Sequence, residues 1–122
     1  MALEAGLAAS GDAVNAPPLL ASTRIALPGG IELDLPAQQV TRDGEVLHLT
    51  PTEFALLREL ASERGRVLTH AQPLRRVWGR GYETETGYLR VYVRRLRAKL
   101  EVDGRPPLIR TQPRVGYRIA TD

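Results

Sequence analysis

The residues with the clearest chemical potential lie between positions 88 and 100, where cations are concentrated. The segment YLRVYVRRLRAKL contains no acidic residue. Its five cations are Arg90, Arg94, Arg95, Arg97 and Lys99. Cationic side chains gathered without counter-charges bind phosphate, and arginine also pairs with the edge of guanine. Duplex DNA is therefore the partner that this segment indicates first.

The spacing of the apolar residues in the same segment predicts a helix that turns the cations toward solvent. The apolar positions follow an i, i+4, i+7, i+11 pattern and are Leu89, Val93, Leu96 and Leu100. This pattern places them on one helical face, which must be buried in a core. The cations are left on the solvated surface, where a polyanion can contact several of them. A solvated basic face without a ligand is the alternative that the segment alone leaves open.

Charge is distributed unevenly along the chain. Residues 1–23 carry two acids and no base, and residues 24–85 carry eight bases and nine acids. Residues 86–122 carry nine bases and three acids, a net charge of +6 in a chain whose overall charge is +3. The positive charge is thus confined to the basic segment and the residues after it, as expected for a surface that contacts phosphates.

Composition argues against several other classes of function. The chain has 122 residues, 43% hydrophobic and 25% charged, which is typical of one globular domain. It has no cysteine, which excludes disulfides, thiolate metal sites and cysteine nucleophiles. The two histidines, His48 and His70, are not expected to meet, and the sequence contains no glycine-rich phosphate loop and no metal-ligand spacing. We therefore expect neither an enzyme nor a cofactor.

The first 23 residues differ in composition from the rest. They are rich in alanine and include an Asn-Ala-Pro-Pro sequence, which predicts a flexible tail or linker. They lack the positive charge of a secretory signal, and no apolar run in the chain has the length of a membrane span. We therefore expect a cytoplasmic protein with no membrane partner, whose folded domain is formed by residues 24–122.

Before the basic segment, the sequence predicts strands followed by two helices. Residues 24–49 contain four short runs of β-type residues separated by turns such as Asp43-Gly44, which predicts an antiparallel meander. The sequence Thr50-Pro51-Thr52-Glu53 is a capping box that begins a helix, and Thr69-His70-Ala71-Gln72 predicts a second helix start. Residues Val67 and Leu68, between these helices, are expected to form an isolated strand.

After the basic segment, the sequence predicts a closing hairpin. Two prolines, Pro106 and Pro107, interrupt the chain, and LIRTQPRVGYRIA then alternates apolar and polar residues. The expected order is a meander, three helices and a hairpin. This is the order of an α+β winged helix-turn-helix domain, in which the hairpin is the wing.

Four segments in this order carry a resemblance to a known family. They are LTPTEFALL, RVLTHAQPLRRVWG, YLRVYVRRLRAKLE and IRTQPRVGYRI. Over residues 24–120 they resemble the output domain of OmpR/PhoB-type response regulators, the DNA-binding half of bacterial two-component systems. The sequence WGRGYETETGYLRVYV and the proline of the wing are most similar to the Kdp potassium-uptake regulators.

The resemblance implies roles for the basic helix. This helix would be the recognition helix and would lie in the major groove of double-stranded DNA. Val91 and Arg95 would face base edges, while Arg94 and Arg97 would lie nearer the phosphates. Two copies would bind tandem half-sites head to tail, forming a dimer on DNA, with sequence-specific binding as the function.

The resemblance also implies roles for the wing and for one loop. Thr111 would contact the DNA backbone, and Arg114 is the candidate cation for the adjacent minor groove. The loop from Gly79 to Thr84 corresponds to the segment that faces RNA polymerase in the family. Glu83 and Glu85 are the acids that could meet a basic polymerase surface, with plain solubility as the alternative explanation for both.

Three features depart from the family pattern. Pro73 follows the expected helix start at Thr69 by four residues, so the helix should lose its first backbone hydrogen bond and begin late or bend. Pro113-Arg114 stands where glycine is more usual in the wing, which would require a positive φ at Arg114. The sequence also lacks the clustered acids of a receiver domain, and its one lysine, Lys99, lies on the basic helix.

Because of this third departure, no phosphorelay site can be assigned within these residues. The chain is either the output domain of a longer regulator or a free-standing DNA-binding domain. Two other functions stay open, namely a winged-helix module that binds protein and a nonspecific nucleic-acid binder. The first would break the basic face with acids or exposed apolar residues, and the second would bind without sequence preference.

Overall fold

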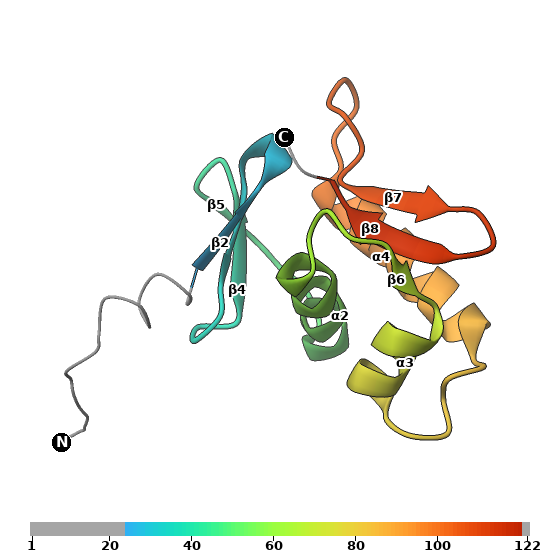
Figure 1. Ribbon diagram of the computed structural model, residues 1–122. Helices are drawn as coiled ribbons and strands as arrows, with labels where there is room; N and C mark the ends of the chain where they lie inside the picture. The colour runs from blue at the N-terminus through green and yellow to red at the C-terminus, as the bar shows by residue number, and fades with distance from the viewer. Residues whose placement is uncertain (1–23, 121–122) are drawn as a thin grey trace, which may run out of the picture.

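Two antiparallel sheets and three helices form the computed structural model, which describes residues 24–120; the sheets lie at the left and at the upper right of Figure 1. The first sheet contains β2 (Arg24–Leu27), β3 (Ile31–Asp34), β4 (Gln39–Arg42) and β5 (Glu45–Leu47), with the short helix η2 (Pro28–Gly30) between β2 and β3. The helices are α2 (Pro51–Ser62), α3 (Ala71–Trp78) and α4 (Thr86–Leu100). The second sheet contains β6 (Leu68–Thr69), β7 (Ile109–Gln112) and β8 (Gly116–Ile119). The predicted winged helix-turn-helix fold is confirmed, whereas the predicted tail at 1–23 lies outside the described residues.

Local sequence signals explain the meander and the start of α2. Asp43 and Gly44 both have positive φ, 53° and 85°, as a two-residue hairpin turn between β4 and β5 requires. At the start of α2, the backbone N–H of Thr50 donates to the Glu53 carboxylate at 2.9 Å, and the backbone N–H of Glu53 donates to the Thr50 hydroxyl at 3.2 Å. Both halves of the predicted capping box are therefore present.

Helix α3 begins one residue later than a cap at Thr69 would give. Its N-cap is His70, and its first backbone hydrogen bond runs from the Leu74 N–H to the His70 carbonyl at 3.4 Å. Pro73 thereby falls in the first turn, where a backbone N–H has no partner within the helix. The predicted late start is confirmed. The second capping box is only half formed, because the Gln72 side chain accepts from the Thr69 N–H at 3.3 Å but the Thr69 side chain does not cap the helix.

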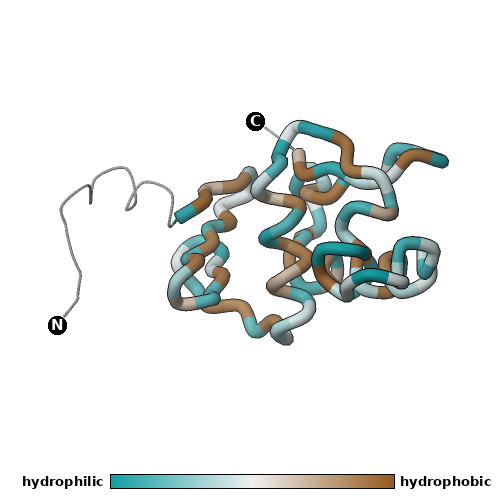
Figure 2. The backbone as a smooth tube through the Cα atoms, turned by 60° about the horizontal axis from the view of Figure 1, so that its bottom comes forward, coloured by the Kyte–Doolittle hydropathy of each residue, from teal (hydrophilic) through white to brown (hydrophobic). Residues whose placement is uncertain are grey.

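The core is built from the apolar faces that the periodicity predicts. On α4, the buried residues are Leu89, Val93, Leu96 and Leu100, as expected. They pack in one cluster with the buried leucines of α2 and with side chains from both sheets. Figure 2 shows hydrophobic and hydrophilic residues interspersed along the folded chain rather than gathered in one segment. Each helix therefore contributes one face to a shared core and leaves another face to solvent.

One strand prediction was wrong about the pairing of the strand. Val67 and Leu68 were expected to form an isolated strand, but the observed strand is β6, Leu68–Thr69, and it pairs antiparallel with β8. Leu68 lies opposite Tyr117, and Thr69 lies opposite Gly116. Because the partners are far apart in sequence, no local signal could indicate the pairing. As a consequence, the wing strands β7 and β8 belong to a three-stranded sheet, and its third strand, β6, lies in the chain between α2 and α3.

Candidate nucleic-acid interface

The exposed face of α4 presents cations without acids. Arg90, Arg94 and Arg95 are all exposed, and Val91, in the middle of this face, has 39% of its surface accessible. None of the three arginines forms a salt bridge with another residue in the range 24–120. Within the part of the chain that the structure describes, these guanidinium groups are thus free to bind an external anion. The predicted residues Val91, Arg94 and Arg95 share this one face.

Arg97 is held differently from the other predicted arginines. Its Nε and Nη2 donate to the Ile109 carbonyl at 3.2 and 3.0 Å, and its Nη2 also donates to the Thr111 hydroxyl at 2.7 Å. Its guanidinium carbon lies 5.9 Å from the centre of the Tyr117 ring. Arg97 therefore joins α4 to the wing. Sequence reasoning missed this bond, because it joins residues 14 positions apart that meet only in the folded domain.

The bond to Arg97 also orients Thr111. Since the Thr111 oxygen accepts from Arg97, its hydroxyl hydrogen can still donate to another acceptor, such as a phosphate oxygen. The Nη1 of Arg97 takes part in none of these three bonds to the wing. The predicted phosphate contacts of both residues therefore stay predictions, and the structure adds that the two residues would act as one unit.

The last cation of α4 is directed into the domain. Lys99 Nζ lies 2.6 Å from a carboxylate oxygen of Glu53 on α2, and Glu53 is only 2% exposed. Burial would raise the pKa of the Glu53 carboxyl, but hydrogen bonds from Lys99 and Thr50 and the charge of Lys99 outweigh it, so the pKa lies below its ordinary value. Arg42 caps the same helix end by donating to the Lys99 carbonyl at 3.0 Å. These contacts fix α4 to α2 and to the meander.

The tip of the wing places Arg114 in a left-handed conformation. Its φ is +67°, as expected for a residue at the turn position that glycine more usually occupies. The Val115 N–H donates across the turn to the Gln112 carbonyl at 3.0 Å. Pro113 supplies the fixed φ that the preceding turn position favours. The Arg114 side chain is exposed. A cation is thus presented at the end of the hairpin.

The loop between α3 and α4 uses one of its two predicted acids locally. A carboxylate oxygen of Glu83 accepts from the Gly81 N–H at 2.8 Å, which holds the loop in shape. Glu85 is exposed at the N-cap of α4, where a negative charge favours the helix dipole. Each acid therefore has a structural role that does not require a partner. Their predicted contact with polymerase stays a prediction.

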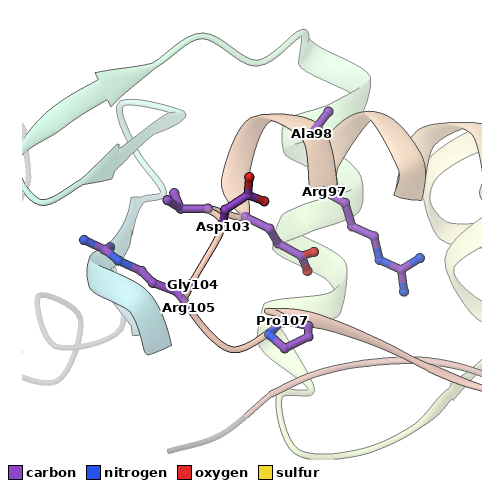
Figure 3. A pocket seen from close by; sticks show the side chains of 8 residues that line it. Arg97, Ala98, Asp103, Gly104, Arg105 and Pro107 are labelled. Carbon is purple, nitrogen blue, oxygen red and sulfur yellow. The ribbon is translucent and has the colours of Figure 1, made fainter.

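A hollow of about 520 Å³ lies beside the interface, between the end of α4 and the segment 101–107 (Figure 3). Three of its four charged residues, Arg97, Glu101 and Arg105, make hydrogen bonds within the domain. The Glu101 carboxylate accepts from the Leu108 and Ile109 N–H groups at 2.8 and 2.9 Å, and Arg105 binds Asp43 at 3.0 Å. Figure 3 shows Arg97 and Arg105 pointing in different directions. The polar groups do not converge on the hollow. Their bonds hold the segment before the wing in place rather than forming a ligand site.

Three further observations on residues 24–120 bear on the predicted functions. In this range, no three His, Asp or Glu side chains gather as a metal site would require. His48 and His70 do not meet there, and the His70 ring instead lies edge-on to Tyr117 with their centres 5.8 Å apart. No helix in this range is long and apolar enough to cross a membrane.

Comparison with known proteins decides the family. The family described as transcriptional regulatory protein, C terminal, matches residues 44–119, which include all three helices and the wing. The chain belongs to this family. It is a DNA-binding output domain of the OmpR/PhoB type, as its resemblance implied. In this winged-helix fold, β7 with β8 forms the wing.

Individual relatives support the assignment of this output domain. The chain is 46% identical over 87 residues to the transcriptional regulatory protein KdpE of Mycobacterium tuberculosis, covering 70% of this chain and 38% of KdpE. It therefore spans about two fifths of that relative's length. The DNA-binding domain of CpxR from E. coli has a TM-score of 0.72 at 26% identity, covering 80% of this chain and 96% of that one. The RstA DNA-binding domain of Klebsiella pneumoniae, solved in complex with the RstA box, has a TM-score of 0.71 at 30% identity with the same coverage, 80% and 96%.

Proposed function

We propose that this domain binds double-stranded DNA sequence-specifically and controls transcription as the output half of a two-component response regulator. The observation that carries the proposal is the acid-free, exposed face of α4 beside a wing that is bonded to the same helix. Arg95 and Val91 would read base edges in the major groove, and Arg94 would contact phosphate. Arg97 with Thr111 would form a second backbone contact, and Arg114 would enter the minor groove.

The mode of action follows from this placement. Two copies would bind tandem half-sites head to tail, with the two recognition helices about one helical turn apart. The loop that carries Glu83 and Glu85 would face RNA polymerase. Phosphorylation would act on a receiver domain in the full regulator, since the curated relatives are more than twice as long as the segment that matches. The domain itself would work in the cytoplasm without a cofactor.

In vitro selection tests this function against its two alternatives. The 122-residue chain would be incubated with a random duplex library at physiological salt, and the retained DNA would be sequenced. Enrichment of a short repeated motif supports sequence-specific binding, and the spacing of the repeats reports the tandem arrangement. Retention without enrichment that vanishes as salt rises would indicate a nonspecific binder. No retention would favour a protein-interaction module.

Replacing Arg95 with alanine should separate base reading from phosphate binding. We expect Arg95→Ala to cost about 1–3 kcal/mol on the selected site and to relax the preference at particular base pairs. Arg94→Ala should instead weaken binding to all sequences and reduce the salt slope by about one. Fluorescence-anisotropy titrations against the selected and scrambled duplexes at several salt concentrations measure both. Equal loss on every duplex for both variants would contradict the division of roles.

A comparison at Arg97 needs a different interpretation. Arg97→Ala is also expected to weaken binding to every sequence and to flatten the salt slope by about one. The same change removes three hydrogen bonds to the wing, so it also frees the hairpin from α4. For this reason Arg94, which has no such bond to the wing, is the cleaner probe of a phosphate contact.

Replacing Arg114 with glycine should test the wing cation without damaging the wing. The left-handed conformation costs an arginine about 1–2 kcal/mol, and glycine adopts it freely but loses about 0.5–1 kcal/mol through the entropy of the unfolded chain. We therefore expect the stability of Arg114→Gly to stay within about 1 kcal/mol of the parent, while its affinity for DNA and its salt slope fall. Urea denaturation and anisotropy titrations measure the two effects. Unchanged affinity would show that Arg114 does not reach the DNA.

A further inference from the structure

Four of the six aromatic residues in the chain gather between α3 and α4, and two of them, Trp78 and Tyr92, also pack against the core. They are Trp78, Tyr82, Tyr88 and Tyr92. As whole residues, Tyr82 and Tyr88 remain 39% and 47% exposed. The two residues packed against the core are therefore joined by two that remain partly open to solvent.

At one end of the cluster, Tyr92 contacts Arg95, the residue proposed to read base edges. Trp78 lies edge-on to Tyr92 with the ring centres 5.2 Å apart, and the guanidinium carbon of Arg95 lies 4.9 Å from the centre of the Tyr92 ring. On a helix, residues three apart are neighbours, and long side chains lean toward the N-terminus. Arg95 therefore lies back over Tyr92, and Trp78 packs edge-on against the same ring.

Among the exposed arginines of α4, only Arg95 has such a contact within residues 24–120. Arg94, its neighbour on the same exposed surface, has none in that range. An arginine that reads guanine must present two N–H groups in the plane of the base, so the orientation of its guanidinium matters more than it does for a phosphate contact. A guanidinium already restricted by a ring also loses less conformational freedom when it pairs.

We propose that Tyr92 is a positioning residue for specificity: its ring, supported by Trp78, holds the Arg95 guanidinium in the orientation that reads a guanine edge. This inference rests on the proposed sequence-specific binding and adds to it. Tyr92 acts through Arg95 and need not touch the DNA. The element that sets base preference is then a pair of side chains on α4 together with one from the end of α3.

The experiment removes the aromatic ring at each of two tyrosines of α4 and compares the base preference of the variants. Tyr92→Leu, Tyr92→Phe and the matched control Tyr88→Leu would each be taken through the selection used for the parent chain. Tyr92→Leu should lower the preference for guanine at the Arg95 position about two- to fivefold, which corresponds to the strength of an exposed cation–π contact, without changing the salt slope. Tyr92→Phe keeps the ring and should retain the parental preference. Tyr88→Leu removes a ring that does not contact Arg95 and should also retain it.

A double variant distinguishes positioning from a structural role. In the Arg95→Ala background, Tyr92→Leu should cause no further loss of base preference, because the side chain through which it acts is gone. Trp78 is the one tryptophan of the chain, so its fluorescence during thermal unfolding reports whether each variant is folded. A folded Tyr92→Leu variant with the parental guanine preference would overturn the inference and leave the proposed function standing. A parent chain that selects no motif would overturn the proposed function, and this inference with it.

Discussion

Replacing Gly116 with alanine is expected to lower the free energy of unfolding by about 3 kcal/mol, at the upper end of the cost of overpacking. A Cβ atom at this position would lie 1.7 Å from the carbonyl oxygen of Leu68 and 2.8 Å from its carbonyl carbon. Both atoms belong to the backbone, which cannot rotate away as a side chain would. Strand β6 would therefore have to separate from β8, and with it Leu68, whose side chain is buried in the core.

Urea denaturation followed by circular dichroism measures this loss, and Gly87 offers a matched control. Gly87 lies in the first turn of α4, and a Cβ atom there would meet nothing within 4 Å. Gly87→Ala should keep or raise the stability, by up to about 1 kcal/mol, because alanine favours a helix. If Gly116→Ala unfolded at the same urea concentration as the parent, the close approach of β6 to β8 would be disproved.

Replacing Lys99 with methionine is expected to lower stability at neutral pH by about 3 kcal/mol, the lower end of the cost of breaking a buried ion pair, because Lys99 is itself 37% exposed. Methionine retains most of the aliphatic stem but leaves the buried Glu53 carboxylate without its cation. A double variant that also carries Glu53→Gln removes the unpaired charge. It should recover part of the loss, since the cost comes from burying a lone charge.

The same pair predicts a pH dependence. The folded pKa of Glu53 is lowered, so its contribution to stability is present above the ordinary glutamate pKa and is lost as pH falls through the folded value. Without Lys99, burial counts for more and the folded pKa rises. The stability deficit of Lys99→Met relative to the parent should therefore narrow as pH falls from the raised Glu53 pKa of the variant to the lowered Glu53 pKa of the parent, because both carboxyls are then protonated. Urea denaturation at a series of pH values checks this, and a deficit independent of pH would contradict the assignment of the pair.

The sequence by itself determined the features that depend on residues a few positions apart. These features are the apolar spacing on α4, the Asp43-Gly44 turn and the capping box of Thr50 and Glu53. Each depends on residues that are at most four positions from the next. Such signals are physical causes of local structure, so they predicted the elements and their order. They also predicted the positive φ of Arg114, because its neighbours and the wing turn define that conformation.

The tertiary structure alone decided how these elements meet, and therefore which cations face solvent. The apolar spacing of the basic segment left all five cations on the solvated surface, but Arg97 is bonded to the wing and Lys99 to Glu53, which lies 46 residues away. The pairing of β6 with β8 likewise depends on Gly116 meeting Leu68 across the fold. A contact of this kind forms only when separate elements dock on one core. The spacing of residues along the chain does not indicate how the elements dock. For that reason the composition of the basic face could be predicted from the sequence, whereas the division of its arginines between structure and solvent could not.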